Sequence, residues 1–321
     1  MKRFLERLGN LSILWVVGLV GILSGVVLTI GFLWARFPMQ ANRLKDRYDL
    51  KHAGVKSVTI HGLHAFERNF CQDGKPCICV GLVHGIADDA RTWKQILMRP
   101  ASSWLRPVRL VAFDMPGSGD SPVPRSNSDY SARVQAETLR AAMGVLCPRW
   151  IVVGNSMGGW IATWEAFDWP QGIEALVLAD SSGLMADATT TRVFYANPSI
   201  DSLKDYQRKA YYIPRELPPP VWSSALDSIR EGNARAEANA QGPSDFLDSH
   251  LGGLKVPTLV LWGEADGITP PAEGKKMAAA IPRAVWDPVS HCAHLPQKEC
   301  PDRVVDAIDY FLGPAELPPK K

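Results

Sequence analysis

WIVVGNSMGG, residues 150–159, is the stretch that decides the fold of this chain. Four of its first five residues are apolar or β-branched, which fits a buried strand. The residues at its end and just after it, GWIATW at 159–164, predict a helix. Between the two lies GNSMG at 154–158, a Gly-x-Ser-x-Gly sequence. The stretch therefore predicts a strand, a tight turn and a helix, with Ser156 in the turn.

A serine in such a turn is well placed to act as a nucleophile. The glycines two residues before and after Ser156 let the strand and the helix approach closely while the serine takes a strained backbone conformation. Its hydroxyl then stands at a helix N-terminus, where free N–H groups favour developing negative charge. The alternative is an ordinary serine in a glycine-rich loop. The position between a strand and a helix favours the nucleophile.

Composition indicates one catalytic domain with an insertion and an N-terminal appendage. The chain has 321 residues, of which 46% are hydrophobic and 21% charged, so it can form a sizeable core. The net charge is +2, and no dense run of Lys and Arg occurs outside the flanks of the N-terminal apolar segment. These features argue against a nucleic-acid partner. No protein partner is identifiable from the sequence.

The N-terminal appendage contains an expected membrane anchor. Residues 11–35, LSILWVVGLVGILSGVVLTIGFLWA, carry no charge and are long enough to cross a hydrocarbon core of about 30 Å. The run exceeds the roughly 7–15 residues of a signal-peptide core, and no clear A-x-A cleavage site follows it. We therefore expect a short tail at 1–10, a single transmembrane anchor at 11–35 and a linker at 36–54. A cleaved signal and a buried core helix are the alternatives.

The cysteines bear on the side of the membrane where the folded domain lies. Basic residues occur on both sides of 11–35, so the positive-inside rule gives no clear orientation. Six cysteines favour an oxidising compartment, and six reduced thiols are the alternative. We therefore expect the domain on the extracytoplasmic side, periplasmic or extracellular. Cys71 and Cys77 flank an expected hairpin and Cys292 and Cys300 are close in sequence, so either pair suits a bridge; the other two are Cys79 and Cys147.

Strands alternate with helices along most of the chain, which indicates a mostly parallel α/β sheet. Helical periodicity appears at 89–98, 130–146 and 303–312, and 42–51 reads as a polar, charged connector. Apolar and β-branched runs predict the strands, which are 55–60, 65–70, 77–83, 108–113, the strand that begins at 150, 175–179, 256–262 and 284–287.

The alternation stops between 181 and 253, where helical pieces occur near 202–210 and 221–240. We expect this insertion to form a helical lid, since so long a stretch without a role is unusual. Its aromatic residues suit the wall of an apolar substrate pocket. For any single one of them, packing of the lid onto the core is the favoured alternative. They are Phe194, Tyr195, Tyr206, Tyr211, Tyr212 and Trp222.

Five sequence blocks, in order, carry a resemblance to a known family. They are LVHGI at 82–86, FDMPGSGDS at 113–121, VVGNSMGG at 152–159, LVLWGEADGITP at 259–270 and HCAHLPQKECP at 291–301. From 61 to 312 the chain resembles the α/β-hydrolase fold, in its lid-bearing serine esterase, lipase and C–C hydrolase branch. The resemblance implies a mostly parallel central sheet flanked by helices. Its expected parts are a core at 55–180 and 254–314, a lid at 181–253 and a C-terminal tail at 315–321.

The resemblance and the chemistry of a weak serine nucleophile together indicate a Ser-His-Asp triad. This fold orders its triad Ser, acid, His, so the base is expected late in the chain. His294 is favoured over His291 because it begins His-x-x-x-x-Glu-x-Pro, the family's usual pattern before the last helix. Asp266 matches the family's usual acid position and is favoured over Glu264. Asp180, after the preceding strand, is the fallback.

Two backbone N–H groups complete the expected site. An oxyanion hole needs donors that are already in place before the reaction. In the resembling family one donor is the residue after the nucleophile, here Met157, and the other is expected from Ile86, which follows His84 and Gly85. Backbone donors do not depend on side-chain identity. His84 itself is expected to be structural.

We therefore expect a membrane-anchored serine hydrolase of the carboxylesterase and lipase type. Its substrate would be an ester, or a related acyl compound, of an apolar or lipid-like small molecule, cleaved through an acyl-enzyme. A C–C bond hydrolase or acyltransferase on the same triad is the alternative, although C–C hydrolases of this family usually carry Trp where this chain has Leu295.

A non-catalytic, membrane-tethered binding protein is the alternative of another class. Such a protein would be expected to have lost triad residues, and all three are present. No cofactor is implied. No metal is expected, because the spacing of His291, Cys292, His294 and Cys300 is not a standard zinc pattern.

Overall fold

The computed structural model describes residues 37–72, 74 and 77–313, together with scattered positions between 15 and 31. The expected tails at 1–10 and 315–321 lie outside the described residues, and so does most of the expected anchor at 11–35. Among the residues that are described, no helix is both long and apolar enough to span a membrane.

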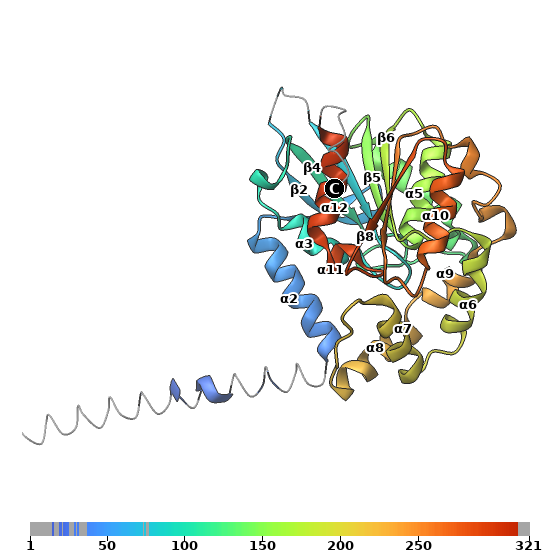
Figure 1. Ribbon diagram of the computed structural model, residues 1–321. Helices are drawn as coiled ribbons and strands as arrows, with labels where there is room; N and C mark the ends of the chain where they lie inside the picture. Colours follow the sequence, from blue (N-terminus) through green and yellow to red (C-terminus); the bar gives the residue numbers. More distant parts are fainter. Residues whose placement is uncertain are drawn as a thin grey trace, which may run out of the picture.

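One eight-stranded sheet forms the centre of the fold, in the strand order β1-β2-β4-β3-β5-β6-β7-β8 (Figure 1). β2 runs antiparallel to β1 and β4, and the other neighbouring pairs are parallel. All eight predicted strands are present. They are β1 (Lys56–Ile60), β2 (Leu63–Asn69), β3 (Ile78–Val83), β4 (Val108–Phe113), β5 (Trp150–Asn155), β6 (Ile173–Ala179), β7 (Thr258–Gly263) and β8 (Ala284–Val289).

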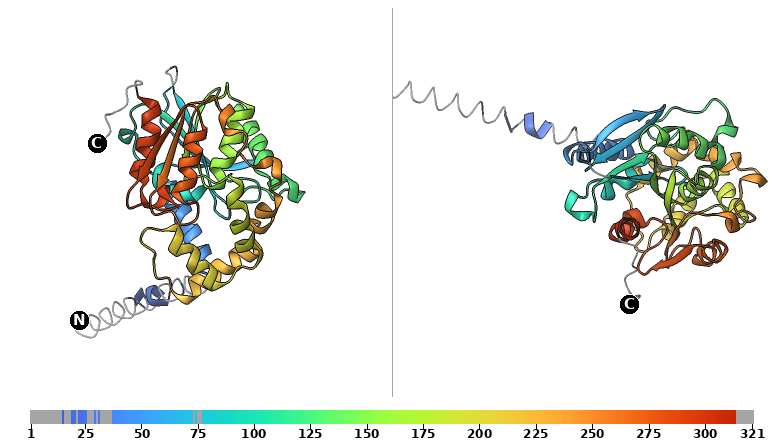
Figure 2. Two further views of the ribbon diagram at one scale, coloured as in Figure 1. Left: turned by 45° about the vertical axis from the view of Figure 1, so that its right-hand side comes forward. Right: turned by 90° about the horizontal axis from the view of Figure 1, so that it is seen from above.

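Helices cover both faces of the sheet (Figure 2). They are α2 (Pro38–His52), α3 (Lys94–Leu97), α4 (Ala132–Gly144), α5 (Met157–Asp168), α10 (Pro271–Ala280), α11 (Pro296–Glu299) and α12 (Pro301–Leu312). In β5, Trp150 and Val152 join a core cluster with residues of α4, α5 and α10. Ile151 and Val153 join the cluster on the other face, with residues of α2, α3 and α12. The central strands therefore need apolar residues on both faces, as their sequences show.

The expected connector at 42–51 is wrong, because these residues belong to helix α2. Leu50 is buried in the core next to α3, and Lys94 of α3 forms ion pairs with Asp46 and Asp49 of α2. The helix is otherwise polar, so it lacks the apolar stripe by which a helix is usually recognised in a sequence. The expected helix at 89–98 is also divided, into a 3-10 turn at Ala90–Trp93 and the short α3.

Four helices form the insertion between β6 and β7, and they lie together beyond one edge of the sheet (Figure 1). They are α6 (Ala188–Ala196), α7 (Ile200–Ala210), α8 (Pro219–Glu231) and α9 (Ala234–Ala240). The expected piece at 202–210 corresponds to α7. The expected piece at 221–240 is two helices, because α8 ends at Glu231 and Gly232 follows it. Helix α6 was not expected, since its three consecutive threonines have low helix propensity.

Three disulfides join all six cysteines. Cys71–Cys77 and Cys292–Cys300, the two pairs singled out in the sequence, have Cα separations of 5.5 and 6.2 Å. The third bridge, Cys79–Cys147, has a Cα separation of 6.4 Å and joins residues 68 apart. All three separations suit a disulfide. The third pair was not expected, because only the folded sheet brings the start of β3 close to the chain that leads into β5.

Candidate active site

Ser156 lies in the turn between β5 and α5, with φ 54° and ψ −122°. This left-handed conformation is costly for a residue with a side chain and is typical of functional sites. The flanking glycines are required by space. A Cβ on Gly154 would collide with the backbone of Gly158, and a Cβ on Gly158 would collide with the carbonyl of Val83. The predicted strand, turn and helix are therefore present, and the Ser156 side chain stands at the N-terminus of α5.

His294 and Asp266 are brought together from two loops at the same edge of the sheet. Asp266 follows β7 and His294 follows β8. The His294 Nδ1 atom lies 2.9 Å from Asp266 Oδ2, and the two residues are 1% and 4% exposed. The backbone of His294 is also fixed, because its carbonyl accepts a hydrogen bond from Asn155 Nδ2 at 2.9 Å and its N–H donates to Ala210 at 3.1 Å.

Asp266 is held in its ionised form by the groups around it. Oδ1 accepts hydrogen bonds from the N–H groups of Ile268 and Thr269, at 2.7 and 3.1 Å. Burial alone would raise the pKa of Asp266, but the His294 ring and these hydrogen bonds outweigh it and lower the pKa below its usual value. An ionised carboxylate beside Nδ1 orients the imidazole and stabilises its protonated form.

The alternatives considered for the acid and the base occupy different environments. Asp180 follows β6 and is completely buried, and its Oδ1 accepts a hydrogen bond from the Gly263 N–H at 2.8 Å. Burial and the neighbouring Asp266 raise the pKa of Asp180 well above its usual value. Glu264 and His291 are exposed. The His291 ring packs against Tyr212, with a centroid distance of 5.2 Å.

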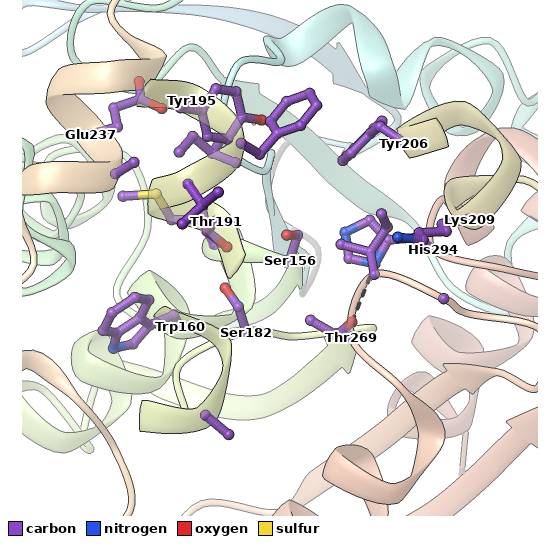
Figure 3. Close-up of a pocket in the computed structure, with 18 of the residues that line it drawn as sticks. Ser156, Trp160, Ser182, Thr191, Tyr195, Tyr206, Lys209, Glu237, Thr269 and His294 are labelled. Carbon is purple, nitrogen blue, oxygen red and sulfur yellow. Dashed lines mark hydrogen bonds between the residues drawn. The ribbon is translucent and has the colours of Figure 1, made fainter. Parts of the chain in front are cut away.

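Thr269 was missed in the sequence, although its side chain contacts both members of the acid–base pair. Its Oγ1 atom lies 2.7 Å from Asp266 Oδ2 and 3.2 Å from His294 Nδ1. Its position three residues after Asp266 was the available signal, but a threonine in a loop carries no distinctive pattern. Figure 3 shows the contact between Thr269 and His294 as a dashed line.

The two expected oxyanion donors, Ile86 and Met157, line the same cavity as Ser156. Met157 is the first residue of α5, where backbone N–H groups have no partner within the helix. The loop before Ile86 passes close to the serine, because a Cβ on Gly85 would lie 3.0 Å from the Ser156 Cβ. His84 makes structural contacts, since its Nε2 accepts a hydrogen bond from the Met115 N–H at 3.0 Å.

A cavity of about 630 Å³ opens over Ser156 and His294 (Figure 3). Helices α6, α7 and α9 of the insertion supply much of its wall. Of the six aromatic residues singled out in the sequence, Phe194, Tyr195 and Tyr206 are among the lining residues. Trp222 is instead buried in a separate cluster within the insertion. Further apolar lining comes from Ile86, Met157, Trp160, Val193, Phe246, Ile268 and Pro270.

The charged residues that line the cavity are mostly acidic. Lys209 is the only lysine or arginine among the described lining residues, and its Nζ atom lies 2.7 Å from Asp205 Oδ2. Glu237 and Glu273 are the remaining ionisable acids there. Burial raises the pKa of Glu237, whose oxygens accept long hydrogen bonds from the Ala87 N–H and the Ser118 hydroxyl. Among the described lining residues, the cavity therefore offers an anionic ligand no lysine or arginine that is not already paired with an acid.

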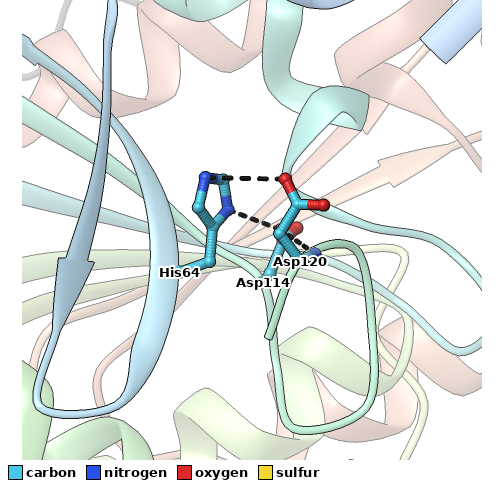
Figure 4. Close-up of side chains that lie close together, drawn as sticks. All are labelled: His64, Asp114 and Asp120. Carbon is cyan, nitrogen blue, oxygen red and sulfur yellow. Dashed lines mark hydrogen bonds and ion pairs between the residues drawn. The ribbon is translucent and has the colours of Figure 1, made fainter. Parts of the chain in front are cut away.

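A second polar cluster, His64, Asp114 and Asp120, braces the loop at 113–121 (Figure 4). His64 Nδ1 lies 2.7 Å from Asp114 Oδ2, and Asp114 also accepts the backbone N–H groups of Ala90 and Asp120. Asp120 forms an ion pair with Arg47 of α2. Both carboxylates therefore already have hydrogen-bond or ion-pair partners within the chain. The cluster links β2, the loop after β4 and α2.

Comparisons with known proteins identify the family and the fold. The model of the Alpha/beta hydrolase family matches residues 82–307. A 2-hydroxy-6-oxononadienedioate/2-hydroxy-6-oxononatrienedioate hydrolase of Cupriavidus pinatubonensis is 28% identical over 81% of this chain and 99% of that protein. Lipase 1 of Psychrobacter immobilis is 27% identical over 83% of this chain and 86% of that protein. The crystal structure of a membrane phospholipase A is similar with a TM-score of 0.69 and 25% identity, over 97% of this chain and 98% of that one.

Proposed function

Because the chain belongs to the alpha/beta hydrolase family, we propose that it is a serine hydrolase that cleaves carboxylic esters of an apolar or lipid-like substrate. One observation carries the proposal. Ser156 is held in a strained turn at the head of α5 and opens on the same cavity as His294, whose ring is hydrogen-bonded to the ionised Asp266.

The proposed reaction follows from the chemistry of these groups. Because Asp266 holds the Nδ1–H tautomer of His294, the Nε2 atom carries the lone pair and takes the proton of the Ser156 hydroxyl. The serine oxygen attacks the ester carbonyl, and the N–H groups of Ile86 and Met157 stabilise the negative oxygen that develops. His294 then gives the proton to the departing alcohol. Water, activated by the same ring, releases the acid from the acyl-enzyme.

The cavity wall supports an uncharged acyl group. Trp160 and Phe246 stack with a centroid distance of 5.0 Å and line the cavity, as does Phe194. Burial of apolar chain against such surface contributes about 25 cal/mol per Å². The insertion at 181–253 is proposed to act as the lid, since its helices complete this wall.

Hydrolysis of a C–C bond is the second candidate, because the relative from Cupriavidus pinatubonensis is named for that class of substrate. A dienedioate carries two carboxylates, and such a ligand calls for unpaired cations in the site. In the described lining the single lysine, Lys209, is already paired with Asp205, and Glu237 and Glu273 add acidic groups. This charge distribution favours the ester.

The membrane anchor at 11–35 is proposed on the sequence, with α2 beginning at Pro38 just after it. The three disulfides support an extracytoplasmic location, because such bonds persist in oxidising compartments. Protease protection of the full chain in right-side-out and inverted membrane vesicles tests this. Digestion of the domain only from the cytoplasmic side would contradict it.

Hydrolysis of p-nitrophenyl esters of rising acyl length tests the proposed function. The full chain in detergent is compared with Ser156→Ala and with Ser223→Ala, which alters an exposed serine of α8. We expect turnover in the wild type and in Ser223→Ala, and a loss of several orders of magnitude in Ser156→Ala. Equal turnover in Ser156→Ala, or none in the wild type with any ester, would argue against an esterase.

A further inference from the structure

The hydroxyl of Thr269 lies at the centre of the acid–base pair. Besides the contacts with Asp266 Oδ2 at 2.7 Å and His294 Nδ1 at 3.2 Å, it lies 3.3 Å from the backbone carbonyl of Asp180. Thr269 is 3% exposed, so water does not compete strongly for these contacts. A Ser-His-Asp mechanism needs no such group, and the proposed roles above leave Thr269 without one.

The distances decide where the single hydroxyl proton goes. Asp266 Oδ2 is the closest acceptor and carries charge, and charge-assisted hydrogen bonds are shorter and stronger than neutral ones. The hydroxyl therefore donates to Asp266 rather than to the Asp180 carbonyl. Its lone pairs are then free to accept, and the neighbouring donor is Nδ1–H of His294. The Nδ1–H group is thus shared between Asp266 and Thr269.

We propose that Thr269 is a positioning residue of the acid–base pair, one that limits the basicity of Asp266 and fixes the His294 ring with Nε2 facing the cavity. The inference rests on the proposed serine hydrolase function, whose base is His294. Among the described residues, the N–H of Ile268, the ring of His294 and the N–H and hydroxyl of Thr269 donate four hydrogen bonds to Asp266, and the Asp180 carboxyl lies beside it. Of these, the hydroxyl is the donor that a side-chain substitution at 269 removes.

Removing this donor has an effect of predictable sign. Without it, Asp266 Oδ2 carries more negative charge and stabilises the protonated His294 ring more strongly. The lost acceptor for Nδ1–H acts in the opposite direction, but that contact is 0.5 Å longer than the contact with Asp266 (3.2 against 2.7 Å), so we expect the first effect to prevail. His294 therefore keeps its proton to higher pH. The rate falls on the acid side of the pH profile, where the base must be free, and changes little on the alkaline side.

Other titratable groups also face the pair, and the design holds them constant. Asp180 lies behind Asp266, Tyr206 and Lys209 reach the cavity from α7, and Glu273 reaches it from α10. Each keeps its place in every variant at 269, so a difference between variants reports the hydroxyl. The Asp180 carboxyl stays bonded to Gly263 in all of them.

The variants separate the hydroxyl from the shape of the side chain. Thr269→Val keeps the shape and removes the hydroxyl, Thr269→Ser keeps the hydroxyl, and Thr269→Ala provides a second hydroxyl-free chain. Thr258→Val is the matched control, since Thr258 is buried in β7, away from Asp266 and His294 in the hydrogen-bond pattern, and its hydroxyl donates to the Val256 carbonyl at 3.1 Å. Nuclear magnetic resonance of the His294 ring nitrogens against pH, assigned with His294→Ala, gives the titration midpoint directly.

We expect the midpoint in Thr269→Val and Thr269→Ala to rise by about 0.5–1 pH unit, the size expected when one charge-assisted bond acts through a neighbour. The acid limb of kcat/KM moves by the same amount, whereas KM stays unchanged. Thr269→Ser and Thr258→Val match the wild type in both readouts. Two results would overturn the proposal. One is a fall in kcat/KM that is the same at all pH values, and the other is an unchanged titration midpoint in Thr269→Val and Thr269→Ala.

Failure of the hydrolase function gives a different result. In that case the wild type turns over no ester at any pH. The kinetic measurements then argue against the proposed reaction of Ser156 and say nothing about Thr269. The ring titration needs no substrate, so it still decides whether the Thr269 hydroxyl controls the Asp266–His294 pair.

Discussion

The Nδ1 atom of His294 and the Oδ2 atom of Asp266 are 2.9 Å apart, although the two residues belong to different loops and are 28 positions apart in the chain. Both side chains are almost completely buried. Burial and the neighbouring Asp266 raise the pKa of a second carboxyl, Asp180, well above its usual value. The two aspartates therefore have pKa values shifted in opposite directions, and Asp266, whose pKa is lowered, is the one bonded to the imidazole.

Asparagine substitutions distinguish the two acids. Asp266→Asn removes the charge beside His294 and favours the wrong tautomer, so kcat/KM falls by about three to four orders of magnitude. The Asp180 carboxyl accepts from the Gly263 N–H rather than from the imidazole, and Asp180→Asn keeps its shape, so kcat/KM falls by less than about tenfold. Ester kinetics at pH 8 measure both. Comparable losses in the two variants would contradict the assignment of Asp266 as the acid partner of His294.

Glu165 makes stability depend on pH. It lies in α5, is completely buried, and neither carboxylate oxygen has a hydrogen-bond partner among the described residues. Burial raises its pKa to about 8, from 4.5. Between these two pH values the folded state holds a proton that the unfolded state has lost. The free energy of unfolding therefore falls as pH rises, and the whole of this loss of stability is reached above pH 8.

Glu165→Gln therefore gains stability over the wild type as pH rises from 5 to 9, by several kcal/mol as an order of magnitude. Urea unfolding at the two pH values measures this. Glu137→Gln, on the exposed side of α4, is the matched control and shows no such trend. A Glu165→Gln advantage that is the same at pH 5 and pH 9 would show that the carboxyl is not protonated in the folded state.

Two glycine-to-alanine changes have opposite expected effects. Gly154→Ala places a methyl group against the backbone of Gly158 and costs about 1–3 kcal/mol of stability, with loss of the serine turn. Gly144→Ala, at the end of α4, meets open space and gains about 0.5–1 kcal/mol. Urea unfolding of both variants measures the difference. A harmless Gly154→Ala would contradict the close approach of β5 and α5.

The Cys292–Cys300 bridge encloses His294, whereas Cys71–Cys77 lies in the connection between β2 and β3, which is not the expected hairpin because β4 lies between these two strands. Replacing Cys292 and Cys300 by alanine frees the loop that carries the base, so kcat/KM falls by about 10- to 100-fold. The matching replacement of Cys71 and Cys77 leaves kcat/KM within about twofold of the wild type, because only a misplaced base costs rate. Ester kinetics of the two double variants test this. Equal kinetics would show that the loop is held by its hydrogen bonds alone.

Local patterns predicted most of the sheet because its central strands, such as β5 and β7, are buried along their whole length. The predicted strand at 108–113 has the same bounds as β4. Five of its six residues are apolar and buried, and the sixth, Arg109, forms an ion pair with Glu67 of the neighbouring strand β2. The serine turn was predictable for a similar reason, because the glycines around Ser156 are demanded by backbone contacts. Features fixed by a few contiguous residues are thus readable from the chain alone.

Features that depend on distant contacts were not readable. Helix α2 is held by Leu50 and by ion pairs to Lys94, so its own sequence resembles a connector. The Cys79–Cys147 bridge needs the folded sheet to bring its ends together. Thr269 acquires its role only because the loops after β7 and β8 meet.

Labelling of the full chain with a fluorophosphonate, followed by mass spectrometry of its peptides, tests whether Ser156 is an activated nucleophile. We expect one adduct, on Ser156, formed faster as His294 loses its proton, and no adduct in Ser156→Ala or after heat unfolding. A folded wild type that forms no adduct, or an adduct on another residue that persists in Ser156→Ala, would contradict the claim that Ser156 is an activated nucleophile.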